Sequence, residues 1–362
     1  MANFYALWNK ARKSQLMLPI CALIVMLFVN AIITPGFFKI SINNGVLYGF
    51  LIDILNRSSE LIILAVGMTF VAASSRGTDI SVGTIAAVSA ALIVRLLGSS
   101  YDGYAMTPAL AIFFGLVLGV LCGAVNGFLV AGLNIQPMVA TLIMYTAGRG
   151  IAQLISSKVL ENGDVATGVI LYVRMESYKY IGGFIPGCIV PTPIFIAIAF
   201  VAITYFVTTK TAMSTYIQTV GINPKAGRLV GINSVLVIFF CYVFSGFCSG
   251  VTGLIASSRI YSCDANNIGL NMELDAILAV ALGGNSLGGG KFNLAGSVIG
   301  AITIQALTTS LYAVGVSADQ LPVYKAVVVI LIVVFQSPAF KKWIAQRKLN
   351  RANSALATVA AR

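Results

Sequence analysis

Residues 272–300 read MELDAILAVALGGNSLGGGKFNLAGSVIG, and this stretch decides what kind of membrane protein the chain encodes. Apolar sequence typical of a helix is interrupted over residues 283–290, a run that contains five glycines, and then resumes. Backbone without regular hydrogen bonds is tolerated at membrane depth only where protein or a watery cavity satisfies its polar groups. The pattern therefore predicts a broken helix in a protein that conducts something, and not a passive anchor.

The composition of the whole chain indicates a polytopic membrane protein. Of 362 residues, 58% are hydrophobic and 9% are charged, whereas about 25% of residues are charged in an average soluble domain. Apolar runs recur from Leu16 to Gln336 without a long polar block, so we expect an all-α fold with about ten transmembrane helices. The predicted spans are residues 16–34, 58–74, 80–97, 107–131, 135–156, 189–208, 234–257, 272–284, 292–312 and 322–337.

Two of these predicted spans, 58–74 and 272–284, are short for a bilayer that requires about 20 helical residues. Each is followed by a polar turn rich in glycine and serine, over residues 74–83 and 283–291. Two short, Gly-interrupted segments in one chain indicate a translocation pathway. The glycines that we expect to form its hinges and turns are Gly77, Gly83, Gly283, Gly284, Gly288 and Gly289.

The net charge of +12 is confined to three segments, residues 1–15, 210–233 and 338–362, which together hold 12 basic residues and no acid. The positive-inside rule places all three in the cytoplasm. The chain then divides into a cytoplasmic N-terminal segment (1–15), a transmembrane domain (16–337) and a basic cytoplasmic tail (338–362). Loop 157–188 lies outside, where it is either a docking surface for an extracytoplasmic partner or a solvated loop.

The inward loop 210–233 carries the signature of a short helix. Asn223 is a favourable N-cap, Pro224 suits the first helical position, and Gly231 suits the position just past the end. We therefore expect a helix over residues 224–230 that presents Lys225 and Arg228 on the cytoplasmic side. It is either a rigid knob for another protein or part of a solvated positive loop.

Several chemistries are excluded by the residue types. The chain has no histidine, so we expect no His-based triad, metal site or proton relay, and no catalytic residue. The nearest approach to a phosphate-binding P-loop, ending in Gly290-Lys291, has Asn285 and Phe292 where the motif needs glycine and a hydroxyl residue. Six cysteines show no metal-ligand spacing. Two of them fall in predicted outward loops, and the sequence leaves a disulfide between them open: Cys188 and Cys263.

Four acids lie in or near the predicted spans, and each has a structural as well as a functional interpretation: Glu60, Asp79, Glu273 and Asp275. Asp79 could cap the helix that we expect to start at residue 80. Glu273 and Asp275 fall in a first helical turn, where the macrodipole favours anions. A proton-coupled carrier would use a buried acid or a basic partner in mid-span, and the basic candidates are Arg149 and Lys325.

Five motifs, in order and spacing, give the chain a resemblance to a known family. They are GTDISVG (77–83), the Asn126-Gly127 pair, the stretch from IQP to RG (135–150), the stretch from VGIN to GI (220–232), and ELDAI with GGNSLGG (273–277 and 283–289). Over residues 53–337 the chain resembles the inner-membrane permease subunits of ribose-type sugar ABC importers. The phrases IQPMVATLI, AGRGIAQLI, DANN and KFNLAGSVIGA are similar to galactofuranose permeases of that family. Arg76 and Asn285 depart from its usual pattern, which has glycine and a small residue or threonine there.

The resemblance implies a permease in the bacterial inner membrane that moves a monosaccharide, galactofuranose, by alternating access. It implies three kinds of protein partner: a second permease subunit that is a related but distinct chain, a separate ABC ATPase that binds ATP and Mg, and a periplasmic sugar-binding protein. No cofactor and no nucleic acid would bind this chain, whose remaining partner is membrane lipid. The helix near residue 224 would couple to the ATPase through six residues: Asn223, Pro224, Lys225, Ala226, Arg228 and Gly231.

A neutral sugar is bound by hydrogen-bonding groups and apolar walls, not by a charged site. The polar groups that we expect along the pathway are Asp79, Ser81, Asn126, Gln136, Thr141, Asn285 and Ser286. A binding protein that supplies selectivity leaves the permease with a weak site or none. The alternatives are a permease for another sugar such as ribose, a secondary carrier that works without ATPase subunits, and a membrane enzyme, against which the lack of histidine and of acid clusters argues.

Overall fold

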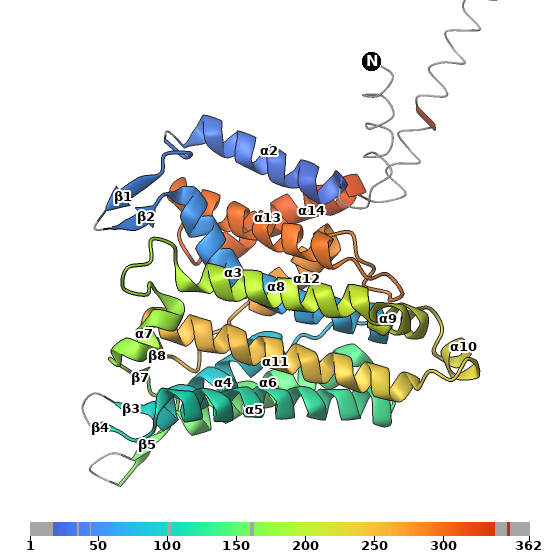
Figure 1. Cartoon of the computed structure of the whole chain (residues 1–362), viewed down its shortest axis with the longest axis horizontal. Coiled ribbons are helices and arrows are strands. Elements are labelled where there is room, and N and C mark those ends of the chain that lie inside the picture. The colour runs from blue at the N-terminus through green and yellow to red at the C-terminus, as the bar shows by residue number, and fades with distance from the viewer. Residues whose placement is uncertain are drawn as a thin grey trace, which may run out of the picture. The chain divides into compact units, whose positions relative to one another are not determined.

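The computed structural model describes residues 17–34, 36–43, 45–99, 103–159, 163–336 and 346–347. Each of the ten predicted apolar helices has a counterpart in these ranges, which confirms the all-α polytopic fold (Figure 1). The predicted N-terminal segment 1–15, and the predicted tail 338–362 except residues 346–347, lie outside the described residues.

The helices are α2 (Met17–Ile33), α3 (Phe50–Ser75), α4 (Val82–Leu97), α5 (Pro108–Gly127), which continues as the π-helix η1 (Phe128–Gly132), α6 (Pro137–Ile155), α7 (Glu176–Gly182), α8 (Thr192–Lys210), α9 (Met213–Ile222), α10 (Pro224–Leu229), α11 (Ser234–Ile260), α12 (Met272–Leu282), α13 (Leu294–Ala313) and α14 (Leu321–Gln336). Short antiparallel ribbons are formed by β1 (Ser41–Asn43) with β2 (Val46–Tyr48), β3 (Gly98–Ser99) with β4 (Gly103–Tyr104), β5 (Lys158–Val159) with β6 (Val165–Ala166), and β7 (Leu171–Tyr172) with β8 (Ser262–Cys263). By contacts the chain forms two compact units, one ending at Thr309 and one beginning at Ser310.

Among the described residues, six helices are long and apolar enough to cross a membrane: α3, α5 with η1, α6, α8, α11 and α13. The prediction that the segment before the first break is short was wrong, because α3 has 26 residues and begins at Phe50. Its first turns tolerate charge because Arg57 and Asp53 pair four residues apart, at 3.0 Å and half exposed. The segment before the second break is short, since α12 has 11 residues.

The core of the first unit is built around α4, which packs against α5, α6 and α11 and is almost entirely buried. Helices α5 and α11 approach closely where glycines face each other. A Cβ on Gly123 would lie 3.0 Å from Gly246 Cα, and a Cβ on Gly119 would lie 2.9 Å from the Gly246 carbonyl oxygen. These small residues therefore allow the backbones of α5 and α11 to pack closely.

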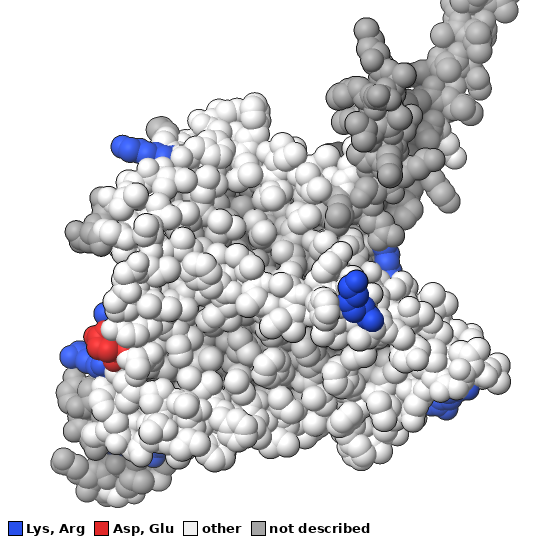
Figure 2. All heavy atoms as spheres, viewed as in Figure 1, with Lys and Arg blue, Asp and Glu red and all other residues white. Residues whose placement is uncertain are grey.

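The face of the first unit over α8, α11 and α5 shows few charged side chains, and the charged residues visible in Figure 2 lie toward its ends. Exposed side chains on these helices include Phe113, Leu121, Ile198, Ile203 and Phe206. A face of this kind suits contact with lipid. The strands and α7 lie at one end of these helices, and α9 and α10 lie at the opposite end (Figure 1).

At the strand end, part of the predicted loop 157–188 is folded against α11. Ribbon β7–β8 pairs Leu171 with Cys263, the Tyr178 hydroxyl lies 2.6 Å from Ser257 Oγ, and the Gly182 N–H donates to Ser258 Oγ at 2.7 Å. Burial raises the pKa of the Tyr178 phenol well above its ordinary value, so the hydroxyl stays protonated. This segment is therefore packed against α11 and is not merely a solvated loop.

The two cysteines at this end are free thiols. Cys263 is fully buried beside β7, and burial raises the pKa of its thiol to about 12. Because the thiolate is the reactive form, Cys263 is an inert structural residue. Cys188 is half-buried and is not bonded to it.

Candidate functional site

The first break joins α3 to α4 and is organised by the Asp79 carboxylate, which is fully buried. Its Oδ1 accepts hydrogen bonds from the Ser81 N–H at 2.9 Å and the Ser81 Oγ at 2.6 Å. Its Oδ2 accepts a hydrogen bond from Ser245 Oγ on α11 at 3.1 Å. Helix α4 begins at Val82 rather than at residue 80, and Asp79 thus binds the N–H at its cap position from just before the helix.

A second layer of the same network comes from α5. Asn126 is fully buried, and its Nδ2 donates to Ser81 Oγ at 2.8 Å. Because the Ser81 hydroxyl gives its proton to Asp79, it is free to accept from Asn126. The Asn126 Oδ1 is also buried and accepts no hydrogen bond from the described part of the chain. This acceptor is available to a hydroxyl or a water if the helices move apart.

Thr141 on α6 closes the first break from a third side. Its buried Oγ1 accepts a hydrogen bond from the Ile80 N–H at 3.2 Å and donates to the Pro137 carbonyl at 3.0 Å. Gln136 precedes α6 as its N-cap residue and is exposed, so it does not join this network. The structure thus brings together three of the predicted pathway residues with Asp79, and leaves Gln136 outside.

The second break, between α12 and α13, is held by the Asn285 carboxamide. Its Nδ2 donates to Ser297 Oγ at 2.8 Å and to the Asn293 carbonyl at 3.0 Å, and its Oδ1 accepts from the Asn293 N–H at 2.6 Å. Ser297 Oγ also lies 2.6 Å from Thr69 Oγ1 on α3. The Asn285 side chain therefore replaces the backbone ladder that the glycine run interrupts.

The glycines predicted to form hinges fall into three kinds: those with a positive φ, those too close to other atoms for a Cβ, and Gly288, which shows neither feature. Gly284 (φ 81) and Gly289 (φ 90) occupy the left-handed region that favours glycine. A Cβ on Gly77 would meet the Pro137 ring, one on Gly83 would collide with the Gly269 carbonyl, and one on Gly283 would collide with Gly296.

Gly288 differs from the other predicted hinge glycines. The nearest atom to a Cβ there is Ser286 Oγ at 3.6 Å, which is ordinary contact. Ser286 itself is half-buried, and its carbonyl accepts from the Gly289 N–H at 3.2 Å. Glycine is thus not required at 288 by this conformation.

The helix predicted in loop 210–233 is α10, which spans Pro224–Leu229. The Asn223 side chain caps it, accepting from the N–H groups of Lys225 at 3.0 Å and Ala226 at 3.2 Å. Gly231, with φ 82, follows its end, and Arg228 Nε donates to Ser234 Oγ at 2.8 Å. Helix α9, directly before α10, was not predicted.

Helix α10 ends in two apolar side chains that the chain leaves uncovered. Leu229 is 89% exposed and Val230 is 71% exposed. The basic residues of α10 are also exposed. Apolar side chains of this size, uncovered on a short capped helix beyond the ends of the long helices, suit a protein contact.

Two further ionisable groups that the sequence singled out in the spans, Glu60 and Arg149, have structural partners. Glu60 Oε1 lies 3.3 Å from Arg259 Nη2, in a largely buried ion pair between α3 and α11. Arg149 on α6 donates to the carbonyls of Ala265 at 2.8 Å and Ile268 at 2.9 Å, which ties down the segment between β8 and α12. No group of three or more potential metal ligands occurs among the described residues.

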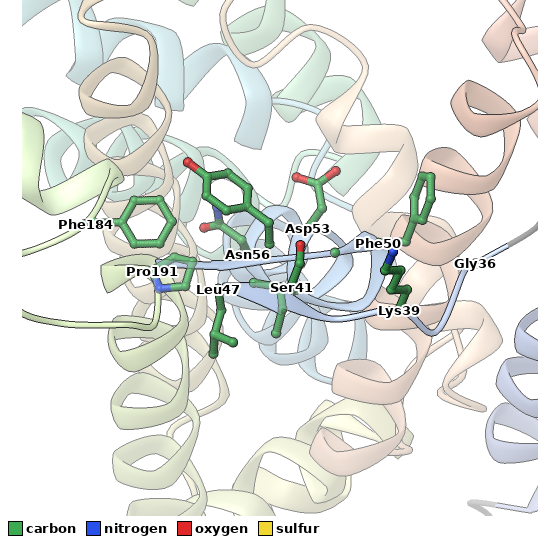
Figure 3. A pocket seen from close by; sticks show the side chains of 12 residues that line it. Gly36, Lys39, Ser41, Leu47, Phe50, Asp53, Asn56, Phe184 and Pro191 are labelled. Atoms are coloured by element: carbon green, nitrogen blue, oxygen red, sulfur yellow. The ribbon is translucent and has the colours of Figure 1, made fainter. Parts of the chain in front are cut away.

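A cavity of about 710 Å³ opens at the strand end, between the β1–β2 ribbon, the first turns of α3 and the segment before α8. Figure 3 shows Phe184 and Pro191 on one side, Asp53 and Asn56 on α3, and Lys39 toward the other side. Its wall mixes aromatic and polar groups. None of the predicted pathway residues lines it, and no motif of the sequence indicated this cavity.

Several residues that complete the two breaks were not predicted. Ser245 supplies a partner for Asp79 from 166 positions away, and Thr69 supplies one for Ser297 from 228 positions away. Both are ordinary small polar residues inside apolar helices, and nothing local distinguishes them. Asn293 did carry a signal, because an Asn directly before α13 is a favourable N-cap residue, and its Oδ1 accepts from the Gly296 N–H at 3.1 Å.

Comparison with known proteins gives consistent matches over most of the chain. A family model described as branched-chain amino acid transport system / permease component matches residues 50–336. The chain is 39% identical to the galactofuranose transporter permease protein of Escherichia coli over 88% of this chain and 89% of that protein. It is 38% identical to the fructose import permease protein of Bifidobacterium longum, over 98% and 96% of the two chains. It is 35% identical to the ribose import permease protein of Escherichia coli, over 91% and 94%. No solved structure matches the chain with significance.

Proposed function

The chain belongs to the branched-chain amino acid transport system / permease component family, and we propose that it is the permease subunit that imports galactofuranose. Its relatives named above are sugar import permeases, so within this family the chain is a sugar ABC importer permease. The observation that carries the choice of sugar is the 39% identity to the galactofuranose permease across 88% of the chain. The fructose permease, at 38% identity across 98%, supports a second candidate sugar.

The ATP that drives import is hydrolysed by a separate ABC ATPase, and α10 is the element that docks on it. Three features support this role: the side-chain cap at Asn223, the uncovered Leu229 and Val230, and the two basic residues Lys225 and Arg228. An apolar tip flanked by cations fits a groove with an apolar floor and an acidic rim. The end of the bundle that carries α10 therefore faces the cytoplasm, as the positive charge of loop 210–233 requires.

The strand end then faces the periplasm and receives the sugar-binding protein. The segment from β7 to α7 is fixed to α11. The cavity beside the β1–β2 ribbon makes this face concave. A surface that is held in place by hydrogen bonds loses little conformational entropy when a partner docks on it. A second permease subunit, related to this chain but distinct, completes the pathway.

The two breaks are the moving parts of the permease during alternating access. In this conformation they are closed by side-chain hydrogen bonds, at Asp79 in the first break and Asn285 in the second. Such bonds are exchanged for others at little net cost, which suits a bistable element. When the first break opens, the buried Asn126 Oδ1 becomes an acceptor for a sugar hydroxyl.

Reconstitution tests this function. The complex is purified through a tag on this chain and placed in vesicles with its binding protein. Uptake of radiolabelled galactofuranose, fructose, ribose and galactose is measured with ATP or a non-hydrolysable analogue. We expect ATP-dependent uptake that is largest for galactofuranose. If uptake is largest for fructose, fructose and not galactofuranose is the imported sugar. If uptake occurs without ATP and is abolished by an ionophore, the protein is a secondary carrier instead.

A further inference from the structure

Arg76 links two segments that lie far apart in the sequence. Its Nε donates to the Gly221 carbonyl at 2.7 Å, and its Nη2 donates to the Ile222 carbonyl. Gly221 and Ile222 are the last two residues of α9, directly before the corner at Asn223 where α10 begins. The last carbonyls of a helix have no partner within it, and a cation there is favoured by the helix dipole. Arg76 thus caps α9 from the first break.

The backbone of Arg76 makes this contact informative. Arg76 ends α3 with φ 59 and ψ 33, in the left-handed region where a residue with a side chain is strained. Glycine takes that conformation without strain and ends helices well. A role confined to terminating α3 therefore favours glycine at this position. The arginine side chain is explained by what its guanidinium holds.

The glycine run of the second break contacts both the end of α3 and the end of α9. The Gly290 N–H donates to the Ala73 carbonyl at the end of α3, at 2.9 Å. A Cβ on Gly289 would lie 2.7 Å from Arg76 Cγ and 2.9 Å from the Gly221 carbonyl oxygen. A Cβ on Gly221 would collide with the Ala73 carbonyl. Three segments are therefore in backbone contact here, and each approach requires glycine.

We propose that Arg76 is a positioning residue that fixes the corner between α9 and α10 to both breaks, so that displacement of α10 by the ATPase moves them together. The inference rests on the proposed function, because it assumes that α10 receives the ATPase. The planar guanidinium suits this task because it grips two neighbouring carbonyls at once, whereas an ammonium acts as a point charge. In this role Arg76 acts through the backbone carbonyls that it holds.

The test compares variants that separate the helix-ending role from the positioning role. Arg76→Gly and Arg76→Asn both tolerate the left-handed conformation but lack the guanidinium, and Arg76→Lys keeps the charge. Lys210→Gln is the matched control, since Lys210 is an exposed cation that ends α8 at the same end of the bundle. Each variant is purified as the full complex, and sugar uptake and ATP hydrolysis are measured in vesicles with the sugar that the parent transports best.

We expect Arg76→Gly and Arg76→Asn to insert normally and to lower sugar uptake per ATP hydrolysed by about fivefold to tenfold. This is the effect expected when a pair of charge-assisted hydrogen bonds is lost at a partly solvated site. Arg76→Lys should recover part of the loss, and the concentration of loaded binding protein giving half-maximal uptake should stay unchanged. Loss of co-purified ATPase from the glycine and asparagine variants alone would also support a displaced corner.

Three results would overturn the inference. They are parental uptake per ATP in both uncharged variants, an equal loss in Lys210→Gln, and failure of both uncharged variants to insert, since that would make Arg76 a folding residue. If the parent complex itself shows no ATP-dependent uptake, the proposed function fails, and that outcome is separate from the fate of the variants.

Discussion

The two breaks of this permease are closed in different ways. The first is closed by side chains from distant helices, because Asp79, Ser81 and the residue 80 backbone are held by groups on α5, α6 and α11. The second is closed mainly by its own neighbourhood, because Asn285 binds Asn293 and Ser297, eight and 12 positions away. The conformation of the first break therefore depends on how the helices of the bundle pack, whereas the conformation of the second is set mainly by its own residues.

The largest effect that we expect comes from the close approach in the second break. Gly283→Val would place side-chain atoms in the backbone of Gly296, which cannot retreat, and should destabilise the fold by about 4 kcal/mol or more. The measurement is the thermal stability and yield of the purified protein. Gly288→Val is the matched control, and it should be close to neutral because a Cβ there has ordinary contacts.

This pair also revises an expectation from the sequence. The sequence grouped Gly288 with the hinge glycines, together with Gly284. In the structure only Gly284 of these two has a positive φ. If Gly283→Val proves as stable as Gly288→Val, the second break is a tolerant linker and the comparison between the breaks fails.

Next in size is Asp79→Ala in the first break. It removes the acceptor for three hydrogen bonds and leaves the Ser81 N–H and two hydroxyls buried. We expect a loss of about 3 kcal/mol, the scale of buried donors left unpaired, in the free energy of unfolding. Asp79→Asn should lose less because one oxygen remains. A double-mutant cycle with Ser245→Ala should show coupling across the bundle, and strictly additive effects would contradict the network.

A smaller effect is expected for Asn285→Ala in the second break. The Asn293 N–H loses its acceptor, and Ser297 Oγ keeps Thr69 as a partner, so the loss should be about 2 kcal/mol. Hydrogen exchange should show this loss over residues 283–297 and leave α5 protected. Equal deprotection of α5 would mean that the second break is as dependent on the bundle as the first.

The smallest effect should follow Gln136→Ala. Gln136 is exposed at the start of α6 and belongs to neither network, although the sequence suggested it as a pathway residue. We expect unchanged thermal stability and unchanged uptake in vesicles. Thr141→Val, five residues further on, is the contrasting variant, because it removes the acceptor for the Ile80 N–H. A loss of uptake in Gln136→Ala with unchanged stability would return Gln136 to the pathway.

Features set by neighbouring residues could be predicted from the sequence. The ten apolar helices follow from hydrophobic runs, and α10 follows from Asn223, Pro224 and Gly231, since capping acts within a few residues. The predicted helix ended at residue 230 and α10 ends at Leu229. The predicted span began at residue 58, whereas α3 begins at Phe50. Its extra turns carry Asp53 and Arg57, whose pairing along the helix makes these charges compatible with it.

Features set by distant residues could not be predicted. The sequence identified Asp79, Ser81 and Asn126 as candidates, but not the Ser245 hydroxyl that binds Asp79 from α11. It marked Arg76 as unusual without indicating that its guanidinium would reach the end of α9. Short-range chemistry thus determined the spans, the caps and the presence of two breaks. The tertiary structure alone decided which helices close each break, because a buried polar group takes whichever partner the packing brings within hydrogen-bond distance.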